Sequence, residues 1–567
     1  MFIKKVRIKR AGRTYTYLRI LESYRQQGRV RQRVLAHLGN LESIKPKQLA
    51  QLSGQLAELG GIPPAAPAQL DHRRVFIYGP VLAIRTFWRQ LGLEEFLGRQ
   101  SASRKWEFEL SRCVWLMVLS RLIRPSSKLQ LTEWHQQLWH RSCLAEGYPQ
   151  YQHYLRSLDL LAQLKGPLQR HLFGRLTDLF SLKLRLVFFD LTSSYFVGSH
   201  CGLSRHGYSR DHRPDKKQIV VGLLMTEEGL PIGHFVFRGH RADKQTLKRV
   251  VRCLRREFQV QQCVFVGDRG LISQVNLDML IEEGFGYLMA LRKRMLSEVK
   301  ELWGRLPDAW QPAGPHLQIK EHFQEDVRYL VCRNPQKQED DRRFREGLLH
   351  KSIEQLQKIA AGSAAASRKL TRAAEVLSKT KAKKFFDITL DAKNNFSWSL
   401  REEVVTAEAQ LDGIYVLKTD QLDWPAAQVV EYYKDLAEVE DGFRQLKSFV
   451  ELRPIRHYAP RRVLGHVSVC VLALLLERMM DLALSRAQLT YRVGMNGPLP
   501  KGAHRPDHPV NRSLKAAVAL ERLDSIKMIE SELGPVTVYR AVRTSDAQER
   551  ILQALGVRSL PLSFQPD

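Results

Sequence analysis

Three acidic residues, Asp190, Asp268 and Glu440, lie in three distant segments of the chain, each of which could present a carboxylate to a shared site. Carboxylate oxygens are the ligands that Mg²⁺ prefers, and a few of them can hold two such ions about 4 Å apart. A pair of divalent ions activates an attacking oxygen and stabilises a leaving oxygen in phosphoryl transfer. The three acids are therefore candidates for a two-metal phosphoryl-transfer site.

Asp190 lies in residues 186–191, a run that is apolar on both alternating faces except for this carboxylate. The pattern is typical of a central strand that is covered on both sides. A buried carboxylate is costly unless it finds hydrogen-bond donors, a cation or a metal, and otherwise its pKa rises. Backbone amides or the start of a following helix are the structural alternative to a metal here.

Asp268 follows a second apolar run, residues 263–266, and lies within Gly-Asp-Arg-Gly at 267–270. The glycines predict a sharp exit from a strand. An Asp between glycines is ordinary turn chemistry. Ligands also gather at the carboxyl ends of strands in sheets with helical crossovers. Both interpretations stay open for this residue.

Glu440 lies in residues 426–448, which predict one helix after Pro425, since Pro suits a first turn. The predicted inward stripe makes Glu440 core-facing, where carboxylates are seldom unpaired. The alternative is an exposed pair with Arg444 at i+4, which contributes only a few tenths of a kcal/mol. The stripe consists of Val429, Tyr433, Leu436, Glu440, Phe443 and Lys447, and the acids expected in solvent are Glu431, Asp435, Glu438 and Asp441.

These residues resemble the motifs of the DDE transposases of bacterial insertion sequences, in the insertion-sequence-four superfamily. The last catalytic helix of that family carries a Tyr-x2-Arg-x3-Glu-x6-Lys signature. Tyr433, Glu440 and Lys447 match it in type and spacing, whereas Leu436 stands at the Arg position and removes that guanidinium. Asp190-Leu-Thr and Gly-Asp268-Arg-Gly also look like family motifs. The resemblance covers residues 180–485.

The resemblance implies an RNase H-like core that performs metal-dependent strand cleavage and strand transfer at the ends of an insertion sequence. Asp190, Asp268 and Glu440 would be both catalytic residues and ligands of two Mg²⁺ ions, with Mn²⁺ as a substitute. It also implies terminal inverted repeats and target DNA as partners, a hairpin intermediate and a homodimer on DNA. Two alternatives are a noncatalytic DNA-binding derivative and a structure-selective nuclease of the same fold.

Composition supports a polyanionic partner independently. With 89 Lys and Arg against 59 Asp and Glu, the 567-residue chain has a net charge of +30, which favours nucleic acid over a membrane surface. The longest apolar stretch, 467–476, is about half of a membrane-spanning helix and predicts a buried core helix. Seven cysteines without a C-x-x-C pair, and a start without an apolar leader, fit a cytoplasmic, nucleoid-associated protein. P-loop, dinucleotide-binding and H-E-x-x-H motifs are absent from the sequence.

The predicted fold class is a multidomain α/β protein with an interrupted mixed-sheet core. Its candidate DNA-binding residues lie in several of the predicted parts: Tyr433, Arg444 and Lys447 on the catalytic helix, Arg210, Arg213 and Lys216 in a basic connection, and Trp398, for which core packing is the alternative to stacking on a base. The predicted parts are a basic N-terminal segment (1–61), a Pro/Ala linker (62–70), a helical domain (75–180), the first part of the core (181–293), an inserted subdomain with strands at its ends (294–410), the second part of the core (411–490) and a C-terminal tail (491–567).

Overall fold

The structure is a computed structural model of the whole chain. It forms two compact units, one of Met1–Val75, Ile529–Arg540 and Leu562–Asp567, the other of Phe76–Met528 and Ala541–Pro561. The residues it describes are 2–10, 13–26, 29–40, 71–102, 108–139, 148–181, 184–198, 200–271, 273–291, 305–314, 316–391, 395–493, 510–533, 536–558 and 563–564, with Gln48, Gln51, Ser53, Gln55, Leu56, Gly60 and Leu302 between them.

The first unit contains the basic N-terminal segment, which forms an antiparallel sheet of β1 (Phe2–Arg10), β2 (Arg13–Gln26) and β3 (Arg29–Asn40). The strands predicted in this segment are thus confirmed. The Pro/Ala linker at 62–70 lies outside the described residues. A second sheet has the order β20-β19-β18-β4, and its strands are β4 (Asp71–Ile77), β18 (Lys527–Leu533), β19 (Val536–Ala541) and β20 (Ser563–Phe564).

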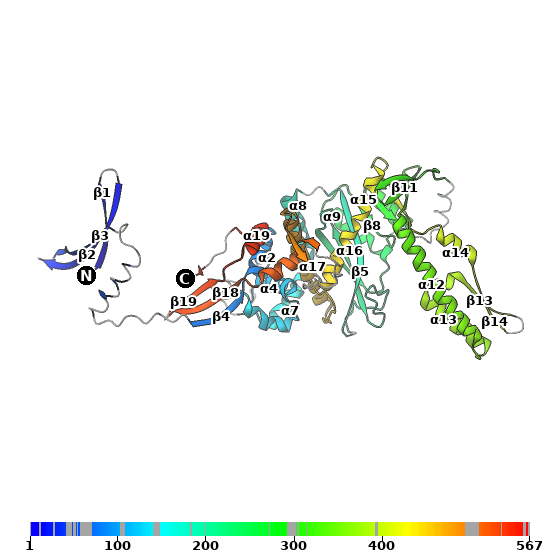
Figure 1. The fold of residues 1–567 in the computed structure, drawn as a ribbon, viewed down its shortest axis with the longest axis horizontal. Coiled ribbons are helices and arrows are strands. Elements are labelled where there is room, and N and C mark those ends of the chain that lie inside the picture. The colour runs from blue at the N-terminus through cyan, green and yellow to red at the C-terminus, as the bar shows by residue number, and fades with distance from the viewer. Residues whose placement is uncertain are drawn as a thin grey trace. The chain divides into compact units, whose positions relative to one another are not determined.

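The helical region of the second unit packs around one long helix, α17 (Pro460–Arg486), which is buried along most of its length (Figure 1). The core helix predicted for this stretch is confirmed. No helix within the described ranges is both long and apolar enough to cross a bilayer. The helices before the core are α2 (Gly79–Gln90), α3 (Leu93–Ala102), α4 (Leu110–Ile123), α5 (Lys128–Trp134), α7 (Tyr151–Gln163) and α8 (Lys165–Phe180), of which α2, α4 and α7 contact α17.

The region predicted as a C-terminal tail is instead folded. Its helices α18 (Ala516–Leu523) and α19 (Asp546–Ala554) both contact α17. Asp481 of α17 accepts a hydrogen bond from the Ala516 backbone N–H at 2.7 Å, which fixes the first turn of α18. A short hairpin of β16 (Thr490–Val493) and β17 (Val510–Ser513) joins α17 to this region.

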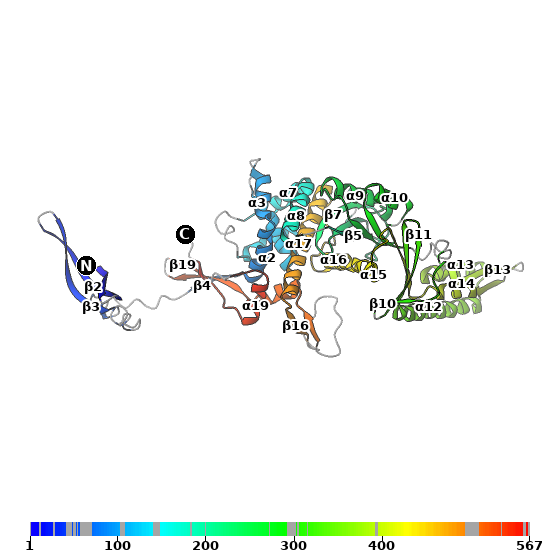
Figure 2. The same cartoon turned by 90° about the horizontal axis from the view of Figure 1, so that it is seen from above.

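The predicted mixed sheet is confirmed, and it has nine strands in the order β10-β11-β12-β15-β9-β8-β5-β6-β7. β5 (Leu186–Tyr195), β6 (Gln218–Met225) and β7 (Pro231–Arg238) are antiparallel neighbours, and β8 (Val264–Gly267) and β9 (Gly286–Ala290) continue parallel to β5. On one side of the sheet lie α9 (Leu247–Arg256) and α10 (Gln274–Glu282), and on the other lie α15 (Ala426–Lys434) and α16 (Leu436–Ser448) (Figure 2).

A glycine lets the two central strands approach. Gly222 of β6 pairs in register with Leu191 of β5, and a Cβ at this position would lie 2.7 Å from the ring of Phe189. Real Cβ atoms do not approach other atoms so closely, so only glycine leaves room for this ring beside Asp190.

The insertion begins later than predicted. The strands that were predicted at its start belong to the central sheet, which they extend next to β15 (Ile414–Thr419). They are β10 (Gln311–Gly314), β11 (Leu317–Gln324) and β12 (Val327–Arg333). The segment between β12 and β15 projects from this end of the sheet around its own small apolar core (Figure 1). It contains α12 (Pro335–Ala361), α13 (Ala366–Thr380), β13 (Phe386–Leu390), β14 (Phe396–Leu400) and α14 (Glu402–Ala409).

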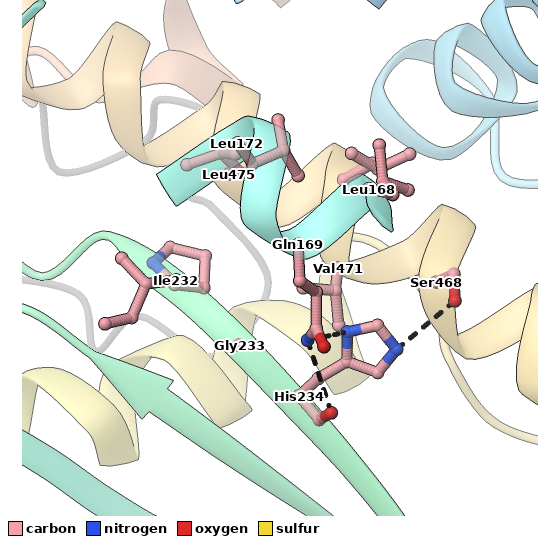
Figure 3. A pocket seen from close by; sticks show the side chains of 11 residues that line it. Leu168, Gln169, Leu172, Ile232, Gly233, His234, Ser468, Val471 and Leu475 are labelled. Carbon is pink, nitrogen blue, oxygen red and sulfur yellow. Dashed lines mark hydrogen bonds between the residues drawn. The ribbon is translucent and has the colours of Figure 1, made fainter. Parts of the chain in front are cut away.

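A buried histidine joins the sheet to the helices at its opposite end. His234 of β7 faces a small cavity of about 20 Å³, with Gln169 of α8 and Ser468 of α17 around it (Figure 3). Gln169 donates to His234 Nδ1 at 3.3 Å, and His234 Nε2 lies 3.2 Å from the Ser468 hydroxyl. Burial lowers the pKa of His234 well below its usual value, so the ring stays neutral. The contacts fix α8 and α17 against the core.

Candidate active site

Asp190 and Asp268 are brought together by strand pairing. β5 and β8 run parallel, with Phe188 opposite Val266 and Phe189 opposite Gly267. Asp190 of β5 follows Phe189, and Asp268 comes directly after Gly267, the last residue of β8. Neighbouring strands of a sheet are about 4.8 Å apart. The apolar residues before each acid therefore bury the strands and align their carboxylates at the same level of the sheet.

Glu440 approaches from the helical side, but not from the core-facing position that its spacing predicted. The predicted single helix is interrupted at Asp435, and the buried stripe of α16 is Leu436, Val439, Phe443 and Leu446. Glu440 is exposed, one residue away from Val439. Because α16 packs directly on β5, Glu440 stands at the edge of this contact and still acts on Asp190 electrostatically.

The electrostatics of Asp190 link the three acids. Its pKa is raised from 3.8 to about 7, chiefly by burial, and the negative charges of Asp268 and Glu440 contribute to the rise. A hydrogen bond from the Leu191 backbone and the charge of Arg210 oppose this rise. A pKa near 7 means that the surrounding protein does not fully compensate the carboxylate charge. This combination is typical of functional sites.

The donor set fits a divalent metal. Carboxylates supply the hard oxygen donors that such an ion prefers, and the negative charge of Asp190, on which Asp268 and Glu440 act, is insufficiently compensated by the protein. Within the ranges that the structure describes, no three His, Cys, Asp or Glu side chains are already gathered into a metal-holding cluster. Asp268 and Glu440 thus act on Asp190 electrostatically without forming a closed ligand cluster with it, and the Glu440 side chain is exposed.

Tyr433 lies among all three acids. Burial raises the pKa of its phenol, followed by the charge of Asp268, while Arg269 opposes the rise and Glu440 and Asp190 add to it. The hydroxyl therefore remains protonated and can act as a donor. Its ring stacks on Tyr415 of β15 with 6.2 Å between the centroids, so the side chain also contributes to packing.

The basic connection before β6 reaches the acids through Arg210. Its guanidinium donates to Asp243 at 2.8 Å, and its backbone N–H donates to the Ser193 hydroxyl. Asp243 in turn lies against Gly270, where a Cβ would be 2.8 Å from the Asp243 carboxylate. The Gly270 turn after Asp268 is therefore held close to Arg210, and this contact was not expected from the sequence.

The remaining predicted basic residues differ in their surroundings. Arg213 binds Asp215 through two hydrogen bonds of 2.8 Å, and Lys216 lies 3.9 Å from the same acid. Lys447 is largely buried and donates to Asp211 at 2.7 Å. Arg444 is exposed and pairs with Asp441, so the alternative pair with Glu440 does not form.

Two acids expected in solvent are paired. Asp441 and Glu438 both accept hydrogen bonds from Arg478 of α17, at 2.7 and 3.2 Å. The Arg478 side chain is only 5% exposed. These contacts tie α16 to α17. The expectation of solvent exposure was wrong for Asp441, whose side chain is 22% exposed, whereas the side chain of Glu438 is exposed, at 52%.

Trp398 lies in β14 of the projecting segment. Its ring meets Phe386 edge-on, with centroids 6.0 Å apart, and it covers the small apolar core of that segment while remaining partly exposed. Core packing, the alternative role, is therefore present. Stacking on a DNA base stays a prediction.

Sequence reasoning missed Asp211, Tyr195 and Arg453, which line an open cleft beside the end of α16 together with Arg213 and Lys447. Asp211 is one acid within a basic connection, and its burial depends on contacts with residues more than two hundred positions away. The local sequence carries no signal for such burial.

Two family patterns match the chain. The pattern described as "IS1634 family transposase, N-terminal domain" matches residues 3–61, and "Transposase DDE domain" matches residues 182–476, more than half of the chain. No curated protein matches in sequence. A solved structure, "Cryo-EM structure of piggyBac transposase synaptic complex with hairpin DNA (SNHP)", aligns over 80% of this chain and 82% of that chain, with 10% identity and a TM-score of 0.37.

Proposed function

Because this chain belongs to the DDE transposases of insertion sequences, we propose that Asp190, Asp268 and Glu440 are the catalytic acids of this DNA transposase. The observation that carries the proposal is the raised pKa of Asp190, caused by burial and by the other two acids. Metal-binding carboxylates need a cation to be fully stable when ionised, and this cluster has that property.

We further propose that the three acids hold two Mg²⁺ ions, for which Mn²⁺ substitutes. When bound, the ions make an oxygen nucleophile reactive at neutral pH and stabilise the leaving oxygen. Asp190, on which the charges of the other two acids act, would hold the ions together with Asp268 and Glu440. Tyr433 would donate its phenolic proton to a phosphate oxygen, and Arg210 would keep the Gly270 turn in place through Asp243.

The proposed reaction begins with attack by water at the phosphodiester that joins the element to its flank. This attack breaks the bond between phosphorus and the 3′ oxygen of the element, which leaves a 3′-hydroxyl on the element and a 5′-phosphate on the flank. The 3′-hydroxyl then attacks a phosphodiester of the opposite strand or of target DNA and displaces the 3′ oxygen of that strand. The basic residues Arg213, Lys216, Arg444 and Lys447 would position DNA phosphates, whereas Trp398 would stack on an unpaired base. The protein would act as a homodimer on paired terminal inverted repeats.

The test is cleavage of a duplex containing the DNA that flanks this reading frame, with Mg²⁺, Mn²⁺ or EDTA. Asp190→Asn and Glu440→Gln should abolish cleavage and leave duplex binding in EDTA within about twofold, because surface DNA contacts are unchanged. Glu431→Gln is the matched control, since Glu431 is an exposed glutamate on the preceding helix. It should cleave like the wild type.

Product analysis separates the alternatives. A transposase joins 3′ ends to a target, whereas a nuclease cuts without joining. A noncatalytic derivative binds with steep salt dependence and never nicks the duplex in Mg²⁺. Normal cleavage by Asp190→Asn or Glu440→Gln would disprove the assignment of the catalytic acids.

A further inference from the structure

An open cleft lies at the end of the catalytic helix and is formed by three separate segments. Lys447 comes from the last turn of α16, Arg453 follows that helix, and Tyr195, Asp211 and Arg213 come from the end of β5 and the connection to β6. The Asp211 side chain is 1% exposed and receives both Lys447, at 2.7 Å, and Arg453 on the same oxygen, Oδ1.

The cations of this cleft are held in defined positions. The Arg213 and Arg453 guanidinium groups lie 5.4 and 6.0 Å from the centroid of the Tyr195 ring, within the range of cation–π attraction. The backbone carbonyl of Glu451 accepts a 3.1 Å hydrogen bond from buried Arg121 of α4. The chain that carries Arg453 is therefore fixed from the helical region.

The burial of Asp211 costs folding free energy, which is unusual for a residue that only stabilises the fold. Its second oxygen, Oδ2, is buried and has no hydrogen-bond partner among the described residues. Buried acceptors without partners destabilise a protein, typically by about 1–3 kcal/mol. Such local costs are concentrated at functional sites, where a residue acts on its neighbours.

We propose that Asp211 is a positioning residue that presets Lys447 and Arg453 as a paired cationic seat for one phosphate of the DNA strand being cleaved. The proposal rests on the transposase function above and extends it to this cleft. Lys447 follows Glu440 by seven residues, which is two helical turns or about 10 Å. The phosphate would lie about three nucleotides from the cleavage point, at about 3.4 Å of rise per nucleotide.

The charge state of Lys447 gives the proposal a distinctive readout. Burial lowers the pKa of Lys447, the hydrogen bond and charge of Asp211 raise it, and the charges of Arg453 and Arg210 lower it. Without the Asp211 charge, Lys447 would lose its proton at a lower pH. A residue that served only the fold would not move the alkaline limit of DNA binding in this way.

The experiment measures binding of a labelled duplex that carries the DNA flanking the reading frame, in EDTA, between pH 7 and pH 9. Asp211→Asn should weaken binding about tenfold at pH 7 and more at pH 9, and Lys447→Gln should reduce the slope of log K against log salt by about 1. Since both changes act on one seat, the double variant should bind no more than about twofold weaker than Lys447→Gln alone.

Asp215→Asn is the matched control. Asp215 is an exposed acid four residues further along, paired with Arg213 and Lys216. Its removal adds the same charge and should leave duplex binding unchanged or tighter. If Asp211→Asn behaves in the same way, Asp211 is merely a repelling charge and the proposal is wrong.

A folding defect in Asp211→Asn would not end the test. The shared seat is then tested with Lys447→Gln, Arg453→Gln and the double variant of these two residues. The proposal would be overturned if Arg453→Gln bound DNA like the wild type, or if the losses of binding free energy in the two single variants were fully additive. Cleavage by the wild type in Mg²⁺ is scored separately. A wild type that binds DNA but does not cleave it would contradict the proposed function. The DNA affinities of the variants test only the proposed phosphate seat in the cleft.

Discussion

Replacing Asp190 by Asn should stabilise the protein when no metal is present. The carboxyl pKa rises from 3.8 to about 7 in the folded chain, mainly through burial. A group whose pKa is raised by folding favours the protonated state. Its contribution to folding is complete below about pH 4 and is lost as the pH rises to about 7. At pH 8 the ionised side chain therefore destabilises the fold, and a neutral amide avoids this penalty.

The magnitude follows from the shift. Three pKa units correspond to about 4 kcal/mol at 1.36 kcal/mol each. Because the side chain is partly exposed, water screens the penalty, and about 1–2 kcal/mol is the reasonable expectation. A gain of this size raises the melting temperature of a large domain by about 2–6 °C.

The assay is thermal unfolding in EDTA at pH 8 and at pH 4.5, for the wild type, Asp190→Asn and the control Asp326→Asn. Asp326 is an exposed acid between β11 and β12. Only Asp190→Asn should melt higher than the wild type at pH 8, and the difference should shrink at pH 4.5. Mg²⁺ should then stabilise the wild type but not the variant. If Asp190→Asn melts at or below the wild-type temperature in EDTA at pH 8, the electrostatic reasoning is wrong.

Further predictions concern metal binding, the Gly270 turn and the buried His234. Mn²⁺ affinity, measured by titration calorimetry, should rise by up to about tenfold per pH unit below pH 7 and level off above it, because the proton on Asp190 competes with the metal; an affinity independent of pH would contradict this. Gly270→Ala should reduce cleavage about tenfold, because its Cβ would displace Asp243 and with it Arg210, whereas Gly347→Ala, with no atom within 4 Å of its Cβ, should not. His234→Ala should lower the unfolding free energy in urea by about 2–4 kcal/mol, since it leaves a cavity and unpaired partners. Because the folded pKa of His234 is depressed, wild-type stability should also fall as the pH drops below about 6.5, and the loss should be smaller in the variant.

The sequence predicts the central strands well because burial on both faces leaves a continuous apolar pattern around Asp190 and before Asp268. It predicts the catalytic helix less well. Leu436 and Phe443 belong to either of two helical stripes. One continues through Glu440 and Lys447, and the other, which is the buried one, continues through Val439 and Leu446. The apolar side chains of Val439 and Leu446 are buried in the core, and Glu440 is therefore exposed.

Other features depend on distant contacts that no local pattern encodes. The strands before the insertion join the central sheet because β12 pairs with β15, about eighty positions further along the chain. The burial of Asp211 likewise depends on Lys447 and Arg453. Alternation and spacing predict which face of an element is apolar, but they do not determine which remote element covers it.

Helix α17 determines which fragments of the protein can fold on their own. It follows the catalytic helix in the chain, yet most of its surface is covered by α2, α4 and α7, which precede the sheet, and by α18 and α19, which come after. A fragment that starts at residue 181 would expose this apolar surface to water, and large uncovered apolar patches lead to aggregation. Truncation at that boundary would therefore yield insoluble protein even if every residue of the acid cluster were retained.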